Sequence, residues 1–155
     1  MTWLDFLTLA LCLAIMVIEV KRGAICAIID AVGIWTALKI AAVSYRGIVS
    51  PQMSNTAAYL TVFLVLTVVV VVVSTLLQRQ WKSDIGPFDS SVAAALGIFS
   101  GLCFSHVAFG AAHLQYGPEY DAFVNSVFRS QVYELHALKG FLQFMGRLGE
   151  TDVAR

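Results

Sequence analysis

Asp30 is the residue of this chain best placed to do chemistry. It lies inside an apolar segment, residues 24–43. At 1.5 Å of rise per residue it would lie about 9 Å below the start of a helix over that segment, where an ionised carboxylate needs a partner. The sequence therefore predicts one of two roles. Either the carboxyl is neutral or hydrogen-bonded within a helix bundle, to Ser74 or Ser100 at similar depth, or it handles a proton or a substrate.

Lys39 and two histidines are further polar residues within apolar segments. Lys39 would lie about 6 Å from the far end of its helix, where the amine reaches water or meets Asp5, and we expect such a structural pair. His106 and His113 are seven positions apart and share one helix face. Two neutral imidazoles can bind haem or a metal, but here they would need His136 or another chain to complete the site. We expect buried, hydrogen-bonded histidines instead.

The sequence lacks the patterns of an enzyme and of a nucleic-acid-binding protein. Cys12, Cys26 and Cys103 fall in apolar segments and form no CxxC, so we expect them to be small buried side chains. No Ser/His/Asp order, nucleophile elbow or phosphate loop is present. Net charge is zero, and no basic run exceeds Lys21-Arg22. We therefore expect no catalytic residues, no metal, no other cofactor and no nucleic-acid partner.

Hydropathy predicts the elements that position these residues. The chain is 59% hydrophobic and 13% charged, whereas about a quarter of a soluble domain is charged. Residues 57–77 contain no charge over roughly 30 Å of helix, the thickness of the hydrocarbon core of a bilayer. Only a helix satisfies the backbone of a single segment in lipid, so this valine-rich run must be helical. The sequence predicts an all-α integral membrane protein with four transmembrane helices, at about 3–20, 24–43, 57–77 and 92–112.

Small residues mark two helix faces. Ala93, Gly97, Gly101 and Ser105 repeat every four residues, so this face of the fourth segment lets a neighbouring backbone approach closely. A shorter stripe of the same kind lies on the second segment, at Gly23, Ala27 and Ala31. We expect the second and fourth helices to pack together across these stripes, and the first two helices to form an antiparallel hairpin.

Residues 113–155 form a different kind of segment. Apolar residues recur at spacings of three and four over residues 119–148, and acidic residues lie in the first turn. This pattern predicts one extramembrane or interfacial amphipathic helix that follows the Gly117-Pro118 break. It packs on the bundle or lies in the membrane interface, or it forms a docking surface for a partner. The last residues, 149–155, are expected to be frayed.

Lysines and arginines near the segment ends predict the orientation, because cytoplasmic loops retain them. Four lie on one side, at Lys21, Arg22, Arg79 and Lys82, and two lie on the other, at Arg46 and Arg129. We therefore expect the first and third loops in the cytoplasm and both termini outside.

Several of these residues also form a pattern known from one protein family. They are Trp3, Asp5, Arg22-Gly23, Gly33-Ile34-Trp35, Asp89, Gly97 and Gly101. With this pattern, residues 3 to about 110 resemble the colicin V production protein (CvpA) family. The resemblance implies a small bacterial inner-membrane protein with about four helices and a role in toxin export or envelope maintenance. It implies no catalytic residues. The chain departs from the family pattern where basic or acidic residues are usual, at Cys26-Ala27, Ser90 and Ser100.

Three functions follow from the sequence. The first is a non-enzymatic scaffold or accessory subunit that packs against other integral membrane proteins. The second is a channel or transporter component that uses Asp30, and it would need several copies of the chain to line a pathway. The third is a histidine-based redox or pigment-binding subunit. The expected partners are the lipid bilayer, other integral membrane proteins and, for some of these roles, further copies of the chain.

Overall fold

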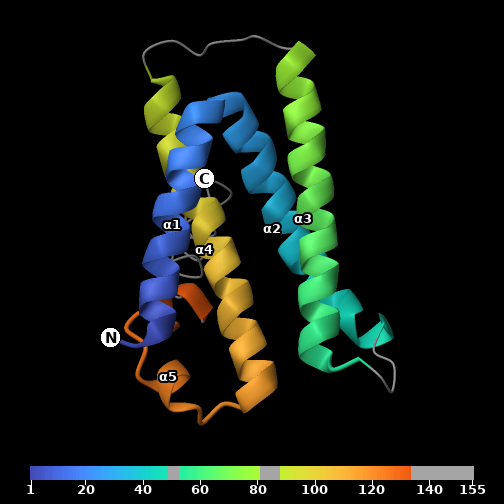
Figure 1. Ribbon diagram of the computed structural model, residues 1–155, viewed down its shortest axis with the longest axis vertical. Helices are drawn as coiled ribbons and strands as arrows, with labels where there is room; N and C mark the ends of the chain where they lie inside the picture. Colours follow the sequence, from blue (N-terminus) through green and yellow to red (C-terminus); the bar gives the residue numbers. More distant parts are fainter. Residues whose placement is uncertain (49–52, 81–87, 134–155) are drawn as a thin grey trace, which may run out of the picture.

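Four long α-helices make up most of the computed structural model, which describes residues 1–48, 53–80 and 88–133. They alternate in direction, so the N-terminus and the C-terminal end of the fourth helix lie at the same end of the bundle (Figure 1). Each helix is long and apolar enough to cross a membrane. The chain is therefore an all-α, multi-pass membrane protein, as predicted. The helices are α1 (Trp3–Arg22), α2 (Ala24–Ile48), α3 (Asn55–Gln80) and α4 (Asp89–Tyr116).

The helices extend beyond the predicted apolar segments, mainly at the ends that carry polar residues. α2 begins at Ala24 as predicted but continues to Ile48, and α4 begins at Asp89 rather than near residue 92. Hydropathy marks only the part of a helix that lies in hydrocarbon. Backbone hydrogen bonding continues into the interface, where polar side chains carry no desolvation penalty, so the helices are longer than the apolar segments.

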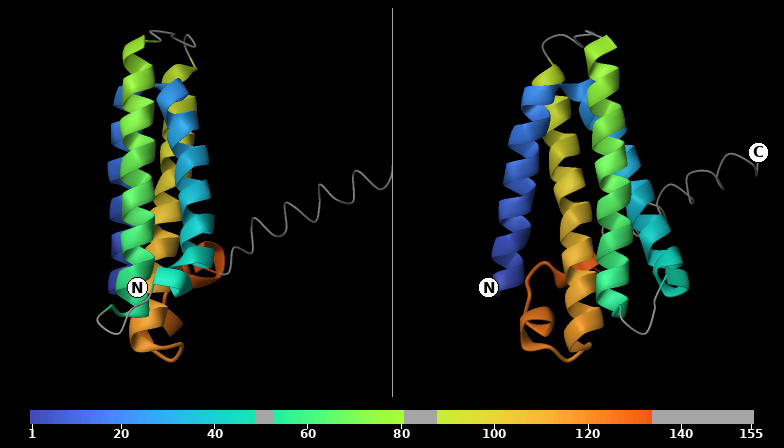
Figure 2. Two further views of the ribbon diagram at one scale, coloured as in Figure 1. Left: turned by 90° about the vertical axis from the view of Figure 1, so that its right-hand side faces the viewer. Right: turned by 45° about the vertical axis from the view of Figure 1, so that its right-hand side comes forward.

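α4 lies at the centre of the bundle. Its most extensive contact is with α1, it also packs against α2, and α3 packs mainly against α2 (Figures 1 and 2). α1 and α2 are joined by a tight turn at Gly23, which has φ of +89°, but they touch little along their length. The predicted hairpin is present, and α4 fills the space between its two arms. The main core lies where α2, α3 and α4 meet, around Ile34, Phe63 and Val107.

Gly97 and Gly101 of α4 face α1, so the prediction that the whole stripe packs against α2 is wrong at its two glycines. A Cβ on Gly97 would lie 2.7 Å from the Cα of Met16, and a Cβ on Gly101 would lie 2.6 Å from the Cα of Cys12. Both distances are shorter than van der Waals contact, so only glycine permits this approach. A small-residue stripe shows that a backbone comes close, but it does not identify the helix.

Alanine contacts connect α2 to α4 at one end of the bundle. Ala24 and Ala27 of α2 are fully buried and form a small cluster with Ala93 of α4. Ala31, the last residue of the α2 stripe, is also buried. Ser105, the last residue of the α4 stripe, is buried too, and its hydroxyl donates to the carbonyl of Gly101 in its own helix. The contact between α2 and α4 therefore uses Ala93, the first residue of the predicted α4 stripe, whereas Gly97 and Gly101 contact α1.

The segment after α4 is not one continuous helix over its described part. A turn at Gly117, with φ of +87°, leads to α5 (Asp121–Val124) and then to a short π-helix, η1 (Arg129–Tyr133). Phe123 and Val132 are buried in a second core with Leu4 of α1. The predicted amphipathic helix over 119–148 is thus broken up to residue 133, and its remainder lies outside the described residues. Part of the predicted apolar face, at Phe123 and Val132, packs on the bundle, whereas Val124 and Val127 of the same face are exposed.

Candidate functional site

Arg22 organises a cluster of buried polar groups beside the turn between α1 and α2. Its guanidinium pairs with the carboxylate of Asp30 on α2 and lies 3.4 Å from Glu19 Oε1, one turn earlier on α1. The side chains of Asp30 and Glu19 are almost completely buried, whereas 17% of the Arg22 side chain is exposed. In the membrane a charged side chain needs such partners. Asp30 therefore has a partner within the bundle, but that partner is the guanidinium of Arg22 and not the predicted hydroxyl of Ser74 or Ser100.

α3 contributes hydroxyl and amide groups to the same cluster. Arg22 Nη2 donates to Ser74 Oγ at 2.6 Å and to Thr75 Oγ1 at 3.2 Å. The side-chain amide of Gln78 donates to the backbone carbonyl of Arg22 at 2.8 Å. Ser74 is fully buried, so its hydroxyl bonds to Arg22 out of contact with solvent. One arginine at the end of α1 thus connects α1, α2 and α3, and we call Glu19, Arg22, Asp30, Ser74 and Thr75 the arginine cluster.

Two carboxylate oxygens in the arginine cluster have no hydrogen-bond partner among the described residues. They are Glu19 Oε2 and Asp30 Oδ1. With all three groups ionised, the formal charge of Glu19, Arg22 and Asp30 is −1. The arrangement therefore has an excess of acceptors and of negative charge, which is the electrostatic setting that attracts a proton or another cation. Ser100, the other predicted partner of Asp30, has a buried hydroxyl without a partner in the described part of the chain.

Asp89 closes the other side of the turn. Its Oδ1 accepts a hydrogen bond from the backbone N–H of Ala24 at 3.1 Å, so a carboxylate from α4 caps the N-terminus of α2. This position also favours negative charge through the helix dipole. A Cβ on Gly23 would lie 3.1 Å from Asp89 Oδ2, and the positive φ of Gly23 disfavours any other residue. The glycine at position 23 therefore leaves the space that the Asp89 carboxylate occupies when it caps α2.

Asp5 and Trp3 connect α1 to the segment after α4 at the opposite end of the bundle. The Asp5 carboxylate accepts hydrogen bonds from the backbone N–H of Thr2 at 2.6 Å and from the hydroxyl of Ser126. Trp3 Nε1 donates to the hydroxyl of Tyr120 at 3.3 Å. These contacts dock the segment onto the bundle.

The predicted pair between Lys39 and Asp5 is not formed. The Lys39 amine lies 4.7 Å from the centre of the Trp35 ring, one turn earlier in α2, a cation–π contact. Asp5 has instead taken partners that the sequence places 121 residues away, at Ser126. The Lys39 side chain is exposed, and its long aliphatic part can extend along apolar surface while the amine rests on the aromatic ring.

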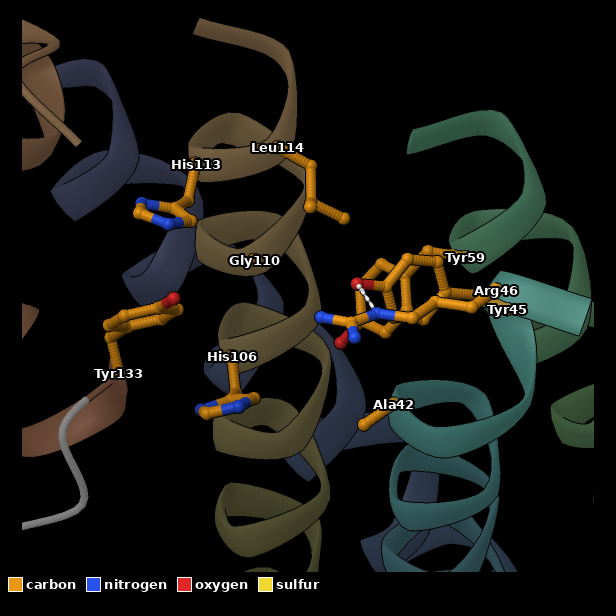
Figure 3. A pocket seen from close by; sticks show the side chains of 9 residues that line it. All are labelled: Ala42, Tyr45, Arg46, Tyr59, His106, Gly110, His113, Leu114 and Tyr133. Atoms are coloured by element: carbon orange, nitrogen blue, oxygen red, sulfur yellow. Dashed lines mark hydrogen bonds between the residues drawn. The ribbon is translucent and has the colours of Figure 1, made fainter. Parts of the chain in front are cut away.

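A pocket with a cavity volume of about 310 Å³ lies near the same end of the bundle. Figure 3 shows Arg46 and two tyrosines on one side of α4, and His106, His113 and Tyr133 on the other, with Gly110 between them. The lining residues come from α2, α3, α4 and η1. They are Ala42, Tyr45, Arg46, Tyr59, His106, Gly110, His113, Leu114 and Tyr133.

The two histidines lie on one face of α4, as predicted, but differ in their hydrogen bonding. His106 Nδ1 lies 2.8 Å from the carbonyl oxygen of Val132, and the ring stacks on Tyr133 with ring centres 5.6 Å apart. His113 packs against Phe123 and Tyr133, and its buried Nδ1 has no partner among the described residues. His136 lies outside the described residues. Within the ranges that the structure describes, no three His, Cys, Asp or Glu side chains are grouped to hold a metal ion.

The structure brings together groups that the sequence treated separately. From the sequence, Arg22 enters only the orientation count and the family-like pattern, and no role is predicted for Glu19. A hairpin places a residue at the end of one helix beside the first turns of the next, so Arg22 and Asp30 could have been paired from their spacing of eight residues. The polar ending of the valine run, Ser74-Thr75, was the second available signal.

No family model matches the chain, and neither the curated proteins nor the solved structures contain a match.

Proposed function

We propose that this chain is a non-enzymatic membrane scaffold or accessory subunit. The observation that carries the proposal is the arginine cluster: the deepest acid of the bundle, Asp30, is bound to a guanidinium of its own chain. That arginine is also held by hydroxyl groups of α3. Groups fixed in this way brace three helices against one another and leave a rigid body with apolar outer faces.

The outer face of α3 is the surface that we propose for a membrane partner. Only 17% of its most apolar stretch is buried within the chain, against 50% for α2. β-Branched valines have one strongly preferred rotamer in a helix, so a neighbouring helix can pack on them with little loss of side-chain entropy. The exposed residues of this face are Leu64, Val65, Val68, Val69, Val72, Val73 and Leu76.

The resemblance to the CvpA family supports the same proposal. The residues that carry it hold helices together in this chain: Asp89 caps α2 at Gly23, and Asp5 docks the segment after α4. Gly97 and Gly101 allow the contact with α1. We propose accordingly an accessory role in export or envelope maintenance in a bacterial inner membrane, with both termini in the periplasm.

Copurification tests the scaffold proposal. A tagged chain extracted in a mild detergent should elute with a membrane protein in fixed stoichiometry. Val68→Trp combined with Val72→Trp should abolish this association, because the indoles hold a neighbouring helix away from α3. Leu13→Trp is the matched control, since Leu13 is exposed to a similar extent on α1. A chain that elutes alone, or one whose partner is retained by the double variant, would contradict the proposal.

One observation favours a second function, that of a channel or transporter component. Glu19 and Asp30 each leave a buried carboxylate oxygen without a partner in the described part of the chain. A proton or another cation would satisfy both. In proteoliposomes, this function predicts a cation flux that Asp30→Asn abolishes although the variant remains folded. The scaffold proposal predicts that Asp30→Asn has no effect on association with the partner.

A further inference from the structure

We propose that the pocket between α2, α3, α4 and η1 binds the phosphate group of an anionic phospholipid. Its described lining contains a guanidinium, three phenol groups and two imidazoles, and none of the described lining residues is acidic. Hydrogen-bond donors and one fixed positive charge, with no carboxylate among them, recognise an anion. Arginine in particular matches two oxygens of a phosphate at once.

Arg46 is the central group of this site. Its Nε donates to the hydroxyl of Tyr45 at 3.1 Å, which orients the guanidinium toward α4 (Figure 3). No carboxylate within the described residues lies within salt-bridge distance of it. The two terminal nitrogens therefore keep their donors for a ligand, and the side chain is exposed at the pocket mouth. An oriented guanidinium without an acidic partner is a preorganised anion site.

Two phenol groups complete the donor set from different elements. Tyr59 of α3 is 5% exposed, and its hydroxyl has no hydrogen-bond partner among the described residues. Tyr133 of η1 lies across the pocket, and burial raises the pKa of its phenol, so the hydroxyl remains a donor at neutral pH. Gly110 lies between them, and a Cβ there would lie 3.3 Å from Cε1 of Tyr59. The missing side chain keeps the pocket open.

The level of the pocket in the membrane indicates a lipid as the source of the phosphate. Arg46 is 22 residues from Ala24, or about 33 Å along α2, whereas the hydrocarbon core is about 30 Å thick. The guanidinium therefore lies at the level of the headgroups. A volume of about 310 Å³ accommodates a headgroup rather than a whole lipid. The exposed Ile40 and Val43, on the same helix, offer apolar surface for the acyl chains.

Titration of the purified chain in detergent tests this site. The probes are dioctanoyl phosphatidylglycerol, dioctanoyl phosphatidylcholine and inorganic phosphate, and the readout is tryptophan fluorescence together with the melting temperature. Phosphatidylglycerol should bind in a saturable manner and more tightly than phosphatidylcholine. Inorganic phosphate should compete weakly, because it lacks acyl chains. Equal binding of the two lipids would overturn the proposal, and phosphate binding as tight as lipid binding would overturn the lipid source.

Variants locate the site. Arg46→Gln should weaken phosphatidylglycerol binding by about tenfold or more, and Tyr59→Phe by roughly threefold to tenfold. Lys21→Gln is the matched control, because it removes one exposed positive charge at the other end of the bundle and should bind as the wild type does. Arg46→Lys, which keeps the charge but not the fork, should lie between Arg46→Gln and the wild type. Undiminished binding by folded Arg46→Gln or Tyr59→Phe would place the lipid elsewhere.

Discussion

Replacing Arg22 by methionine should destabilise the bundle more than any other single change in the arginine cluster. Arg22→Met keeps a long side chain but leaves Glu19 and Asp30 buried without their common positive charge. Removing one partner of a buried ion pair costs about 3–5 kcal/mol, and the partial exposure of Arg22 favours the lower end. The lost hydrogen bonds to Ser74 and Thr75 add about 1 kcal/mol each. The total of about 5 kcal/mol corresponds to a fall in melting temperature of roughly 10–20 °C.

Asp30→Asn is the informative comparison. It changes the formal charge of Glu19, Arg22 and Asp30 from −1 to zero, and the amide oxygen can still accept from the guanidinium. We expect a loss of about 1 kcal/mol or less, or a melting temperature within about 4 °C of the wild type. In the double variant, Arg22→Met with Asp30→Asn, one carboxylate fewer is left unpaired. Its destabilisation should therefore be smaller than the sum of the two single effects by about 1–3 kcal/mol.

Thermal unfolding in detergent, followed by tryptophan fluorescence, measures these differences. Circular dichroism before heating establishes that each variant is helical at the start. An Arg22→Met chain that melts within about 2 °C of the wild type would refute the bracing role of the cluster. An Asp30→Asn chain that is as unstable as Arg22→Met would also refute it. The negative charge of Asp30 would then be required for stability, whereas the bracing role requires only a group that accepts from Arg22.

Two further predictions concern packing and orientation. Gly97→Leu or Gly101→Leu should separate α4 from α1 and lower the melting temperature by several degrees. Ala95→Leu, at an exposed position of α4, is the control and should leave the melting temperature nearly unchanged. Equal effects at the three positions would show that the stripe is not a packing face. In intact cells with a permeabilised outer membrane, Asn125→Cys should react with an impermeant thiol reagent and Lys21→Cys should not, and the reverse labelling would invert the proposed topology.

Hydropathy predicted the four helices because each must satisfy its own backbone in lipid. It could not predict the neighbours of each helix. The α4 glycines indicated a close approach, but the α1 residues that make it, Cys12 and Met16, are neither glycine nor alanine. Contacts made by the backbone of a partner leave no signal in the side chains of that partner.

The segment after α4 shows a second limit of sequence patterns. Its apolar spacing predicted a single helix, yet the described part bends after α5. The Asp5 carboxylate accepts from the hydroxyl of Ser126 and from the backbone N–H of Phe128, at 3.4 Å for the latter. That N–H is therefore withdrawn from the helical ladder by an acid more than 120 positions away. Periodicity marked Phe123, which is buried, but also Val124 and Val127, which are exposed, because the path of the chain depends on tertiary hydrogen bonds as well.

The cap on α2 has a consequence for biogenesis. The carboxylate that receives the N–H of Ala24 belongs to Asp89, 65 positions later, and the hydroxyls around Arg22 come from α3. During synthesis the first hairpin therefore enters the bilayer with an uncapped helix start and a guanidinium that lacks part of its final surroundings. Both deficits end only when the third and fourth segments have left the translocon. In a nascent chain stopped before Asp89, the start of α2 would remain without its carboxylate cap.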